Sequence, residues 1–317
     1  MKKILIGLGM VLVMVLAGFL LVLVHLPNRS VEPRFEGRAF SEWQDDFTEF
    51  RSIGEHKRGE RALLAIGTNA IPYLLGELQV NSTPMKTRLI TWAMKQRLLL
   101  PLRIRFGVWR NPPLSEEGHH ARALSGFVFL GSTAQSALPA LAELVKRPDT
   151  ALNATKILAR YDNAGKLYFG SEVFVPLLVS LTNQNPEVRR IAADALGLTQ
   201  TNTSVVVSAL LRTLHDPNPE ARATAAMSLG EGIYQEEAAT IIPALINCLN
   251  DTNGLVRARA AKRLGLLGAN ARSALPALSR VLTDVDGEVR LRATTAINQI
   301  DPEAAASVKT SPVATRQ

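Results

Sequence analysis

The strongest constraint on the fold is a phrase of about 33 residues that occurs four times between Val173 and Ile300. A period of this length is typical of a solenoid, in which units stack because none buries its apolar face alone. One column of the aligned phrases holds an arginine every time, and the column six residues earlier holds Asn or Asp. The two columns are Arg189, Arg222, Arg257 and Arg290, and Asn183, Asp216, Asp251 and Asp284.

Each phrase predicts two helices joined by a tight turn. In the first copy the apolar residues recur at i, i+3, i+4, i+7 and i+8, which is one face of an α-helix. A first helix is predicted over 173–181, with Pro176 in its first turn, where no amide donor is lost. The run NQNP lies between the helices, and such runs form turns whose Asn or Asp caps the next helix. The apolar positions are Val188, Ile191, Ala192, Ala195 and Leu196.

These columns resemble the HEAT-repeat family, in particular the bacterial subgroup called PBS-lyase HEAT-like repeats. The resemblance implies an all-α fold, a right-handed α-solenoid that binds proteins along its concave side. A minority of relatives in that subgroup are bilin lyases or DNA-glycosylase-like enzymes. FEGRAFSEW followed by AIGTNAIPYLL also resembles membrane-anchored bacterial HEAT-repeat proteins, a likeness that implies no activity. The matching residues are Leu210, Asp216, Arg222, Leu229, Leu245, Asp251, Val256, Arg257 and Leu264.

Residues 1–26 predict one transmembrane helix. Two lysines precede an uncharged apolar run from Ile4 to Val24, whose 21 residues span the hydrocarbon core of a bilayer. The alternative is a cleaved signal peptide, but the apolar run is long for one and no A-x-A site follows. Lys2 and Lys3 favour a cytoplasmic N-terminus. We therefore expect a single-pass signal anchor in the inner (cytoplasmic) membrane, with the solenoid on the extracytoplasmic side.

The rest of the chain predicts a linker, a solenoid and a tail. Residues 27–40 contain two prolines and no periodicity, which favours a short linker. The solenoid is expected over 41–302, with about seven helix pairs and an irregular insertion at about 99–117, where prolines and glycines interrupt the helical pattern. Residues 303–317 are small and polar and predict a disordered tail.

The N-terminal end of the solenoid is expected to be an aromatic cap. Ser41 and Gln44 have the spacing of a capping box, so a helix is predicted from Ser41 to Phe50. Trp43, Phe47 and Phe50 lie on one face of that helix. Burial of these rings inside the cap is the main interpretation, and an exposed aromatic docking site is the alternative.

The basic charge of the chain is concentrated in residues 79–115. This window holds seven Lys and Arg and no Asp or Glu, and it accounts for +7 of the net charge of +8. Basic residues beside exposed apolar ones suit an anionic lipid surface or an acidic partner. The alternative is that the aromatic side chains fill a gap in the stack while the arginines are solvated. The predicted contact residues are Arg103, Arg105, Trp109 and Arg110.

The arginine column predicts a structural ladder. Each arginine would pair with an Asp of its own or the neighbouring repeat, mostly at the surface, for about 0–1 kcal/mol per pair. Between 173 and 300 there are 12 Lys or Arg and 11 Asp or Glu. A nucleic-acid groove needs a net basic track, so binding of nucleic acid is not expected.

No residue set in the chain predicts catalysis, a cofactor or a metal. Cys248 is the only cysteine and occupies an apolar core column, so neither a disulfide nor a reactive thiol is expected. Glu116, Glu117, His119 and His120 form the one His and carboxylate cluster. Its spacing does not match ligands on one helix face, and acids at a helix start complement the helix dipole.

The function predicted from the sequence is a membrane-anchored scaffold that binds an unidentified protein partner along the concave face, and not an enzyme. Solenoids offer extended concave surfaces for this purpose. The alternative is a lyase-like enzyme or enzyme accessory, which would need polar groups converging in a concavity. The residues expected to line the concave face are Arg190, Asp194, Thr224, Met227, Arg259, Lys262, Arg292 and Thr295.

Overall fold

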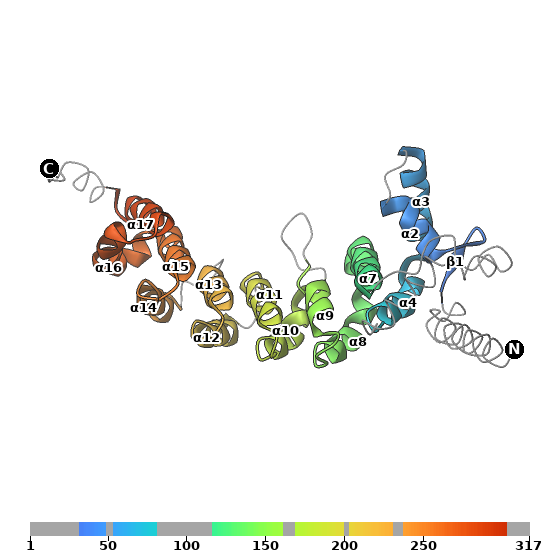
Figure 1. The fold of residues 1–317 in the computed structure, drawn as a ribbon, viewed down its shortest axis with the longest axis horizontal. Coiled ribbons are helices and arrows are strands. Elements are labelled where there is room, and N and C mark those ends of the chain that lie inside the picture. The colour runs from blue at the N-terminus through green and yellow to red at the C-terminus, as the bar shows by residue number, and fades with distance from the viewer. Residues whose placement is uncertain are drawn as a thin grey trace, which may run out of the picture. The chain divides into compact units, whose positions relative to one another are not determined.

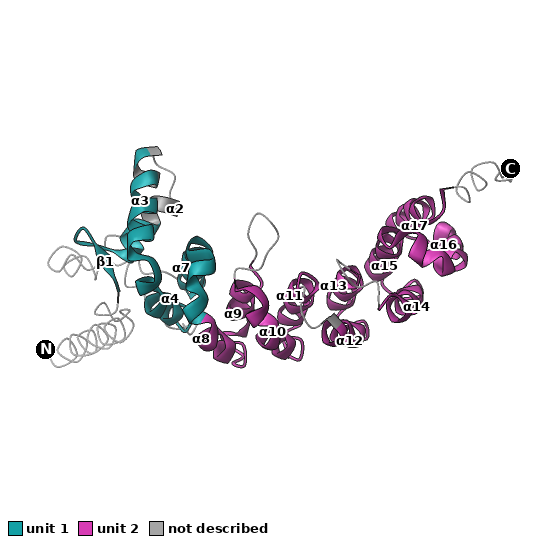
Figure 2. Cartoon of the chain, turned by 180° about the vertical axis from the view of Figure 1, so that it is seen from behind, with its two compact units in different colours: residues 1–137 teal, residues 138–317 magenta. Residues whose placement is uncertain are grey.

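The computed structural model describes residues 32–48, 53–80, 116–160, 169–199, 203–230 and 237–302. The chain divides into two compact units, Met1–Ala137 and Leu138–Gln317, which are coloured separately in Figure 2. The predicted transmembrane segment, nearly all of the basic window and the tail lie outside the described residues. None of the described helices combines the length and apolar composition that crossing a membrane requires.

Unit 1 begins with a β-hairpin. Strand β1 (Arg34–Phe35) pairs antiparallel with β2 (Arg38–Ala39). The turn residues Glu36 and Gly37 both have positive φ, at 50° and 76°, which is the conformation that two-residue hairpin turns use. The hairpin takes the place of the second half of the predicted linker 27–40. The sequence analysis missed it because the tight turn pairs two short segments that have no periodicity of their own.

The described helices of unit 1 pack as two pairs. Helix α2 contacts α3, and α4 contacts α7. The predicted capping box is wrong: the Ser41 amide donates to Glu32 Oε1 at 2.8 Å, and Gln44 Nε2 donates to the Arg122 carbonyl oxygen at 2.6 Å. Trp43 is buried, and its indole nitrogen donates to the Phe35 carbonyl oxygen at 3.0 Å, which joins the hairpin to the cap. The elements are α2 (Phe40–Thr48), α3 (Ile53–Ile66), η1 (Gly67–Ala70), α4 (Ile71–Glu77), α7 (Glu116–Leu130) and η2 (Gly131–Ala137).

Unit 2 is a stack of helix pairs, as the repeats predict. Figure 1 shows its first helices in one row and its second helices in another, and the second helices follow the inner side of the curve of this unit. The second helices α11, α13, α15 and α17 pack side by side in that order. The pairs are α8 (Leu138–Leu144) with α9 (Ala151–Leu158), α10 (Phe174–Ser180) with α11 (Pro186–Gly197), α12 (Thr203–Thr213) with α13 (Pro219–Ser228), α14 (Ala238–Cys248) with α15 (Gly254–Leu266), and α16 (Leu275–Arg280) with α17 (Gly287–Ile300).

Short 3₁₀ segments precede or extend some first helices. They are η3 (Gly170–Val173), η4 (Gly268–Ala274) and η5 (Val281–Thr283). In the four copies of the phrase, the turn between the two helices ends in the predicted cap. The cap side chain accepts a hydrogen bond of 2.9 Å from the amide two residues further along the chain, which satisfies one free donor of the second helix. The caps are Asn185, Asn218, Asn253 and Asp286.

A glycine column sets the close approach of successive second helices. Glycine lies eight residues after the ladder arginine in the first three copies, at Gly197, Gly230 and Gly265, while Asn298 takes this place in the fourth. A Cβ atom on Gly197 would lie 3.1 Å from the Cα atom of Ser228, and one on Gly265 would lie 2.8 Å from the Cα atom of Ala296. Each of these two glycines therefore lets one helix touch the backbone of the next.

A second column also changes in the last repeat. Ala193, Ala226 and Ala261 are fully buried at equivalent positions of the first three copies. The fourth copy has Thr294 there, and this threonine is exposed. Its hydroxyl donates to the Arg290 carbonyl oxygen of its own helix. At these two positions the last repeat is thus more polar and bulkier than the repeats inside the stack.

Candidate partner-binding surface

The arginine column forms a ladder of paired hydrogen bonds between neighbouring repeats. Arg222 reaches the next repeat, where its Nε and Nη2 atoms each donate to one oxygen of Asp251 at 2.8 Å. Arg189 contacts Asp216 in the same two-pronged way, at 2.6 and 2.7 Å. The pair in the following rung has distances of 2.8 and 2.7 Å and consists of Arg257 and Asp284.

Each rung also fixes the turn of its own repeat. Arg222 Nη1 donates to the Asp216 carbonyl oxygen at 2.9 Å, and Asp216 Oδ1 accepts from the Asn218 amide at 2.8 Å. The same contacts recur at the Arg257 turn. One aspartate therefore organises its own turn and receives the guanidinium of the preceding repeat. This double role explains why the Asn or Asp column and the arginine column keep a fixed spacing of six residues.

The predicted ladder is confirmed for three of its four arginines, but the expected surface position of its pairs is wrong. The side chains of the three arginines are 12–15% exposed and those of the three aspartates are 7–14% exposed. The burial arises because the carbonyl groups of each turn surround the guanidinium. An exposed pair contributes about 0–1 kcal/mol, whereas breaking a buried pair costs about 3–5 kcal/mol. The arginine column is therefore occupied by internal contacts and offers little to a partner.

The ladder lowers the pKa of its carboxyl groups. Hydrogen bonds from the Arg257 guanidinium are the main cause of the lowered pKa of Asp284. For Asp216 and Asp251, burial by itself acts to raise the pKa. Hydrogen bonds from their arginines and from backbone amides outweigh that effect, so the pKa of both carboxyl groups also falls below its ordinary value.

The lowered pKa values predict that the ladder is lost in acid. A carboxyl group whose pKa is lower in the folded chain stabilises it above the ordinary pKa of about 3.9, and this contribution disappears as pH falls through the folded-state value. We expect urea unfolding to show that Asp251→Asn is less stable than the parent at neutral pH. The difference should shrink as pH falls through the lowered folded-state pKa of Asp251, where the parent aspartate becomes protonated. Asp194→Asn, an exposed residue outside the ladder, should match the parent throughout; a difference that persists in acid would contradict the interpretation.

The last rung has no carboxylate. Arg290 Nη1 donates to the carbonyl oxygens of Asp284 and Val285, at 2.7 and 3.1 Å. No ion pair involves its side chain within the described part of the chain. Arg290 therefore keeps the turn contacts of the other ladder arginines without the contact between repeats.

The predicted concave residues lie on neighbouring second helices. Because the ladder keeps the repeats in register, Asp194, Met227 and Lys262 occupy equivalent positions on α11, α13 and α15. Asp194 is exposed, while the other two are half-buried. Of the remaining predicted contact residues, Arg259 is exposed and Thr224 is half-buried.

Two of the predicted contact residues already have partners on their own helices. Arg190 pairs with Glu187 at 2.8 Å, and Arg292 pairs with Glu288 at 2.7 Å. These pairs are partly solvated, so a partner can compete for them at small cost. The predicted lipid-contact residues Arg103, Arg105, Trp109 and Arg110 lie outside the described residues.

Two exposed leucines of the second helices were missed by the sequence analysis. Leu266 on α15 is 52% exposed and Leu291 on α17 is 56% exposed. Leu266 follows Lys262 by four residues, so helical spacing alone would have placed it on the same face. Leu291 gives no such signal, because the two preceding repeats carry a buried alanine at its position, Ala223 and Ala258.

A buried arginine was also missed. Arg263 is 4% exposed and lies in a core column whose other members are Ala195, Ser228 and Ala296. Its guanidinium donates to the Met227 carbonyl oxygen in the last turn of α13. A cation at a helix C-terminus is favoured by the helix dipole. Arg263 therefore joins two repeats from inside the core.

One member of the predicted histidine and carboxylate cluster, His119, contacts a buried glutamate of α4. Glu77, at 1% exposed, contacts His119 Nδ1 through its Oε2 atom at 2.9 Å. Burial raises the pKa of Tyr73 above its ordinary range, and the charge of Glu77 adds to this effect. His119 thus pairs across 42 residues rather than with its neighbours Glu116 and Glu117, which lie in the first turn of α7. Across the described ranges, no three His, Cys, Asp or Glu side chains are placed to hold a metal ion.

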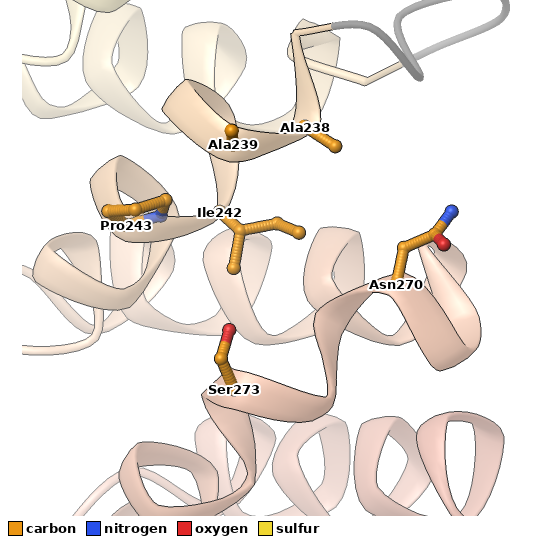
Figure 3. Close-up of a pocket in the computed structure, with 6 residues that line it drawn as sticks. All are labelled: Ala238, Ala239, Ile242, Pro243, Asn270 and Ser273. Atoms are coloured by element: carbon orange, nitrogen blue, oxygen red, sulfur yellow. The ribbon is translucent and has the colours of Figure 1, made fainter.

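The first-helix row carries a shallow depression. The depression has a volume of about 360 Å³, and Figure 3 shows the Ile242 side chain pointing from α14 toward the segment that carries Asn270 and Ser273. Its lining contains no acid, base or thiol, so it supplies no catalytic group.

The Cys248 thiol is buried in the core as predicted, and burial raises its pKa to about 11, so little thiolate is present at neutral pH.

The repeat region of the chain matches a known protein family. Residues 172–241 and 242–308 match the HEAT-repeat family. These two stretches contain all four phrases with their ladder, so the HEAT repeats coincide with the most regular part of the stack. No curated protein sequence matches the chain.

Several solved structures are similar to the chain, among them three crystal structures of engineered proteins from the Northeast Structural Genomics Consortium. The first has 19% identity and a TM-score of 0.47, with 73% of this chain and 96% of the other covered. The second has 20% identity and a TM-score of 0.43, over 84% and 68% of the two chains. The third has 16% identity and a TM-score of 0.41, over 83% and 98%.

Proposed function

We propose that the HEAT repeats bind a protein partner along the second helices α11, α13, α15 and α17. The observation that carries this proposal is the separation of stacking residues from accessible ones on these helices. The ladder arginines, the glycines and the buried alanines are used for stacking. The column of Asp194, Met227 and Lys262 is left accessible over three successive repeats. A strip of mixed polar and apolar side chains on a firm scaffold suits recognition of another protein.

The proposal extends to how the scaffold is held. Residues 1–26 would act as a signal anchor in the inner membrane, with the repeats on the extracytoplasmic side, as the lysines before the apolar run favour. The basic window 79–115 would then lie near the bilayer, where Arg103, Arg105, Trp109 and Arg110 contact anionic lipid. In this proposal the chain is a scaffold and not an enzyme. The proposal includes a right-handed solenoid of about seven pairs that resembles the PBS-lyase HEAT-like subgroup.

Photo-crosslinking from two rows of helices tests the binding surface. A photoreactive amino acid replaces either Met227 on α13 or Val175 on α10, which is 64% exposed in the first-helix row. The full chain is then irradiated in the cells that produce it. We expect a discrete adduct of defined mass from position 227 and none from position 175, because the partner follows the second helices. Adducts of equal yield from both positions, or from 175 alone, would refute the proposed surface.

A further inference from the structure

The exposed face of α15 carries a stripe of two cations and one leucine. Arg259, Lys262 and Leu266 follow one another at i, i+3 and i+7, a spacing that places them on one side of a helix. Arg259 and Leu266 are exposed, and Lys262 is half-buried. We call these three residues the α15 stripe.

The cations of the α15 stripe are not neutralised within the described residues. Helix α15 contains no Asp or Glu. Neither Arg259 nor Lys262 takes part in an ion pair or a side-chain hydrogen bond in the part of the chain that the structure describes. This sets them apart from Arg257 on the same helix, which is held by Asp284.

The neighbouring helices do not supply the missing negative charge at these positions. On α13, the residues in the columns of Arg259 and Lys262 are Thr224 and Met227. On α17, the equivalent residues are Arg292, which is held by Glu288 of its own helix, and Thr295. Arg292 is therefore a third cation beside the α15 stripe. Its partner Glu288 is already engaged and does not neutralise Arg259 or Lys262.

The charge in one column of this surface changes sign along the stack. The column that holds Lys262 on α15 holds Asp194 on α11, while Glu187 on α11 is already paired with Arg190. A partner that follows the second helices meets Asp194 on α11 and the α15 stripe two repeats further along. The surface therefore has a built-in direction, which would fix the orientation of a charged partner segment.

We propose that the α15 stripe docks an acidic segment of the partner protein, in which two carboxylates meet Arg259 and Lys262 and an apolar side chain covers Leu266. This inference rests on the proposed function and specifies the chemistry of the partner. Charge complementarity directs the encounter, and burial of Leu266 adds apolar contact area. The exposed leucine favours a protein segment over a polyanion, because phosphate backbones offer the leucine nothing. The near balance of 12 basic and 11 acidic residues from 173 to 300 also lacks the basic track that nucleic acid needs.

Synthetic peptides provide the test. Two fluorescein-labelled helical peptides carry Glu-x-x-Glu-x-x-x-Leu and its reverse on an Ala and Gln background, since the direction of docking is not fixed in advance. Matched peptides carry Lys in place of both Glu. Binding to the full chain in neutral detergent is followed by fluorescence anisotropy. We expect at least one acidic peptide to bind, its lysine counterpart not to bind, and affinity to fall several-fold as salt rises from about 50 to 500 mM.

Charge-reversal variants locate the binding. Arg259→Glu with Lys262→Glu should weaken binding of the acidic peptide at least tenfold. The control, Arg212→Glu with Arg280→Glu, changes the net charge equally at two exposed positions of the first-helix row and should leave binding unchanged. Equal loss in both variants would show attraction to the overall charge, and this would refute the stripe. Absence of peptide binding, equal binding of the lysine peptides, or tighter binding of a single-stranded DNA 20-mer or of anionic vesicles at the stripe would also refute it.

The outcomes separate this inference from the proposed function. An adduct at position 227 together with no acidic-peptide binding would leave the partner surface standing and remove the α15 stripe. Absence of the adduct would remove the proposed function, whatever the peptides do.

Discussion

Replacing Arg222 with alanine is expected to lower the free energy of unfolding by about 3 kcal/mol, the lower end of the range for breaking a buried pair. The change leaves Asp251 in its largely buried site without the guanidinium that compensates its charge, and it frees the carbonyl oxygen of Asp216. Urea unfolding of the full chain, followed by circular dichroism, measures the loss.

Arg290→Ala is the matched control for this ladder variant. Arg290 has the same column and the same turn contacts, but no carboxylate, so its loss should cost only about 0.5 kcal/mol, as for other surface changes. The double variant Arg222→Ala with Asp251→Ala should recover part of the stability, because no unpaired charge then remains. If Arg222→Ala and Arg290→Ala cost the same, the contact between repeats contributes nothing and the ladder only shapes turns.

Gly265→Ala is expected to destabilise the stack by about 2 kcal/mol, within the range for overpacked cores. The new Cβ atom would lie 2.8 Å from the Cα atom of Ala296, which is backbone and cannot turn aside, and it would also meet Gln299 Oε1. Helix α17 must therefore move away from α15. The measurement is again the urea unfolding midpoint and slope of the full chain.

Gly76→Ala makes the same chemical change where space is open. Nothing lies within 4 Å of a Cβ atom built on Gly76, which is an exposed residue of α4. Alanine has a helix propensity up to about 1 kcal/mol better than glycine, so this variant should be as stable as the parent or more so. Stabilisation by Gly265→Ala as well would mean that the two second helices do not approach as closely as described.

The regular part of the fold could be predicted because its signals are local. The helical spacing around Val188, the Asn caps and the two repeating columns each fix a structure within a few residues. The sequence also predicted that Arg222 pairs with an aspartate. It did not decide between Asp216 and Asp251, because the register between neighbouring repeats depends on how the helices stack and not on spacing along the chain. The burial of the pair follows from that register and was underestimated for the same reason.

Contacts between distant segments could not be predicted. The pair of Glu77 and His119 joins residues 42 positions apart, and neither residue belongs to a repeating column. The hairpin before α2 turns at Glu36 and Gly37, a dipeptide that carries a weaker turn signal than Asn-Gly or Asp-Gly. In both places the structure depends on partners that local periodicity does not reveal.

The candidate surface was predictable in outline and not in detail. Arg259 and Lys262 were expected on the accessible side of the second helices, and the structure has the first exposed and the second half-buried, while their contact with a partner stays a prediction. Whether each cation is free depends on its neighbours on the same and adjacent helices. Arg190 and Arg292 therefore looked equivalent to Arg259 in the sequence, although acids of their own helices hold them. The exposed Leu266 completes this face and makes its recognition chemistry more specific than a set of charges.

Asn298 changes the face on which a further repeat would stack. Where the earlier copies keep glycine, its half-buried side chain fills volume that the backbone of a further helix would need, and its amide group would lose water there. Thr294 likewise puts a hydroxyl where stacking requires a small buried alanine. A fifth unit added by tandem duplication, or another molecule docking end to end in the register of the stack, would clash at Asn298. We therefore expect these two side chains to disfavour end-to-end growth in this register, a hazard for proteins built from self-similar units. Engineered extension would have to begin by restoring glycine at position 298 and alanine at position 294.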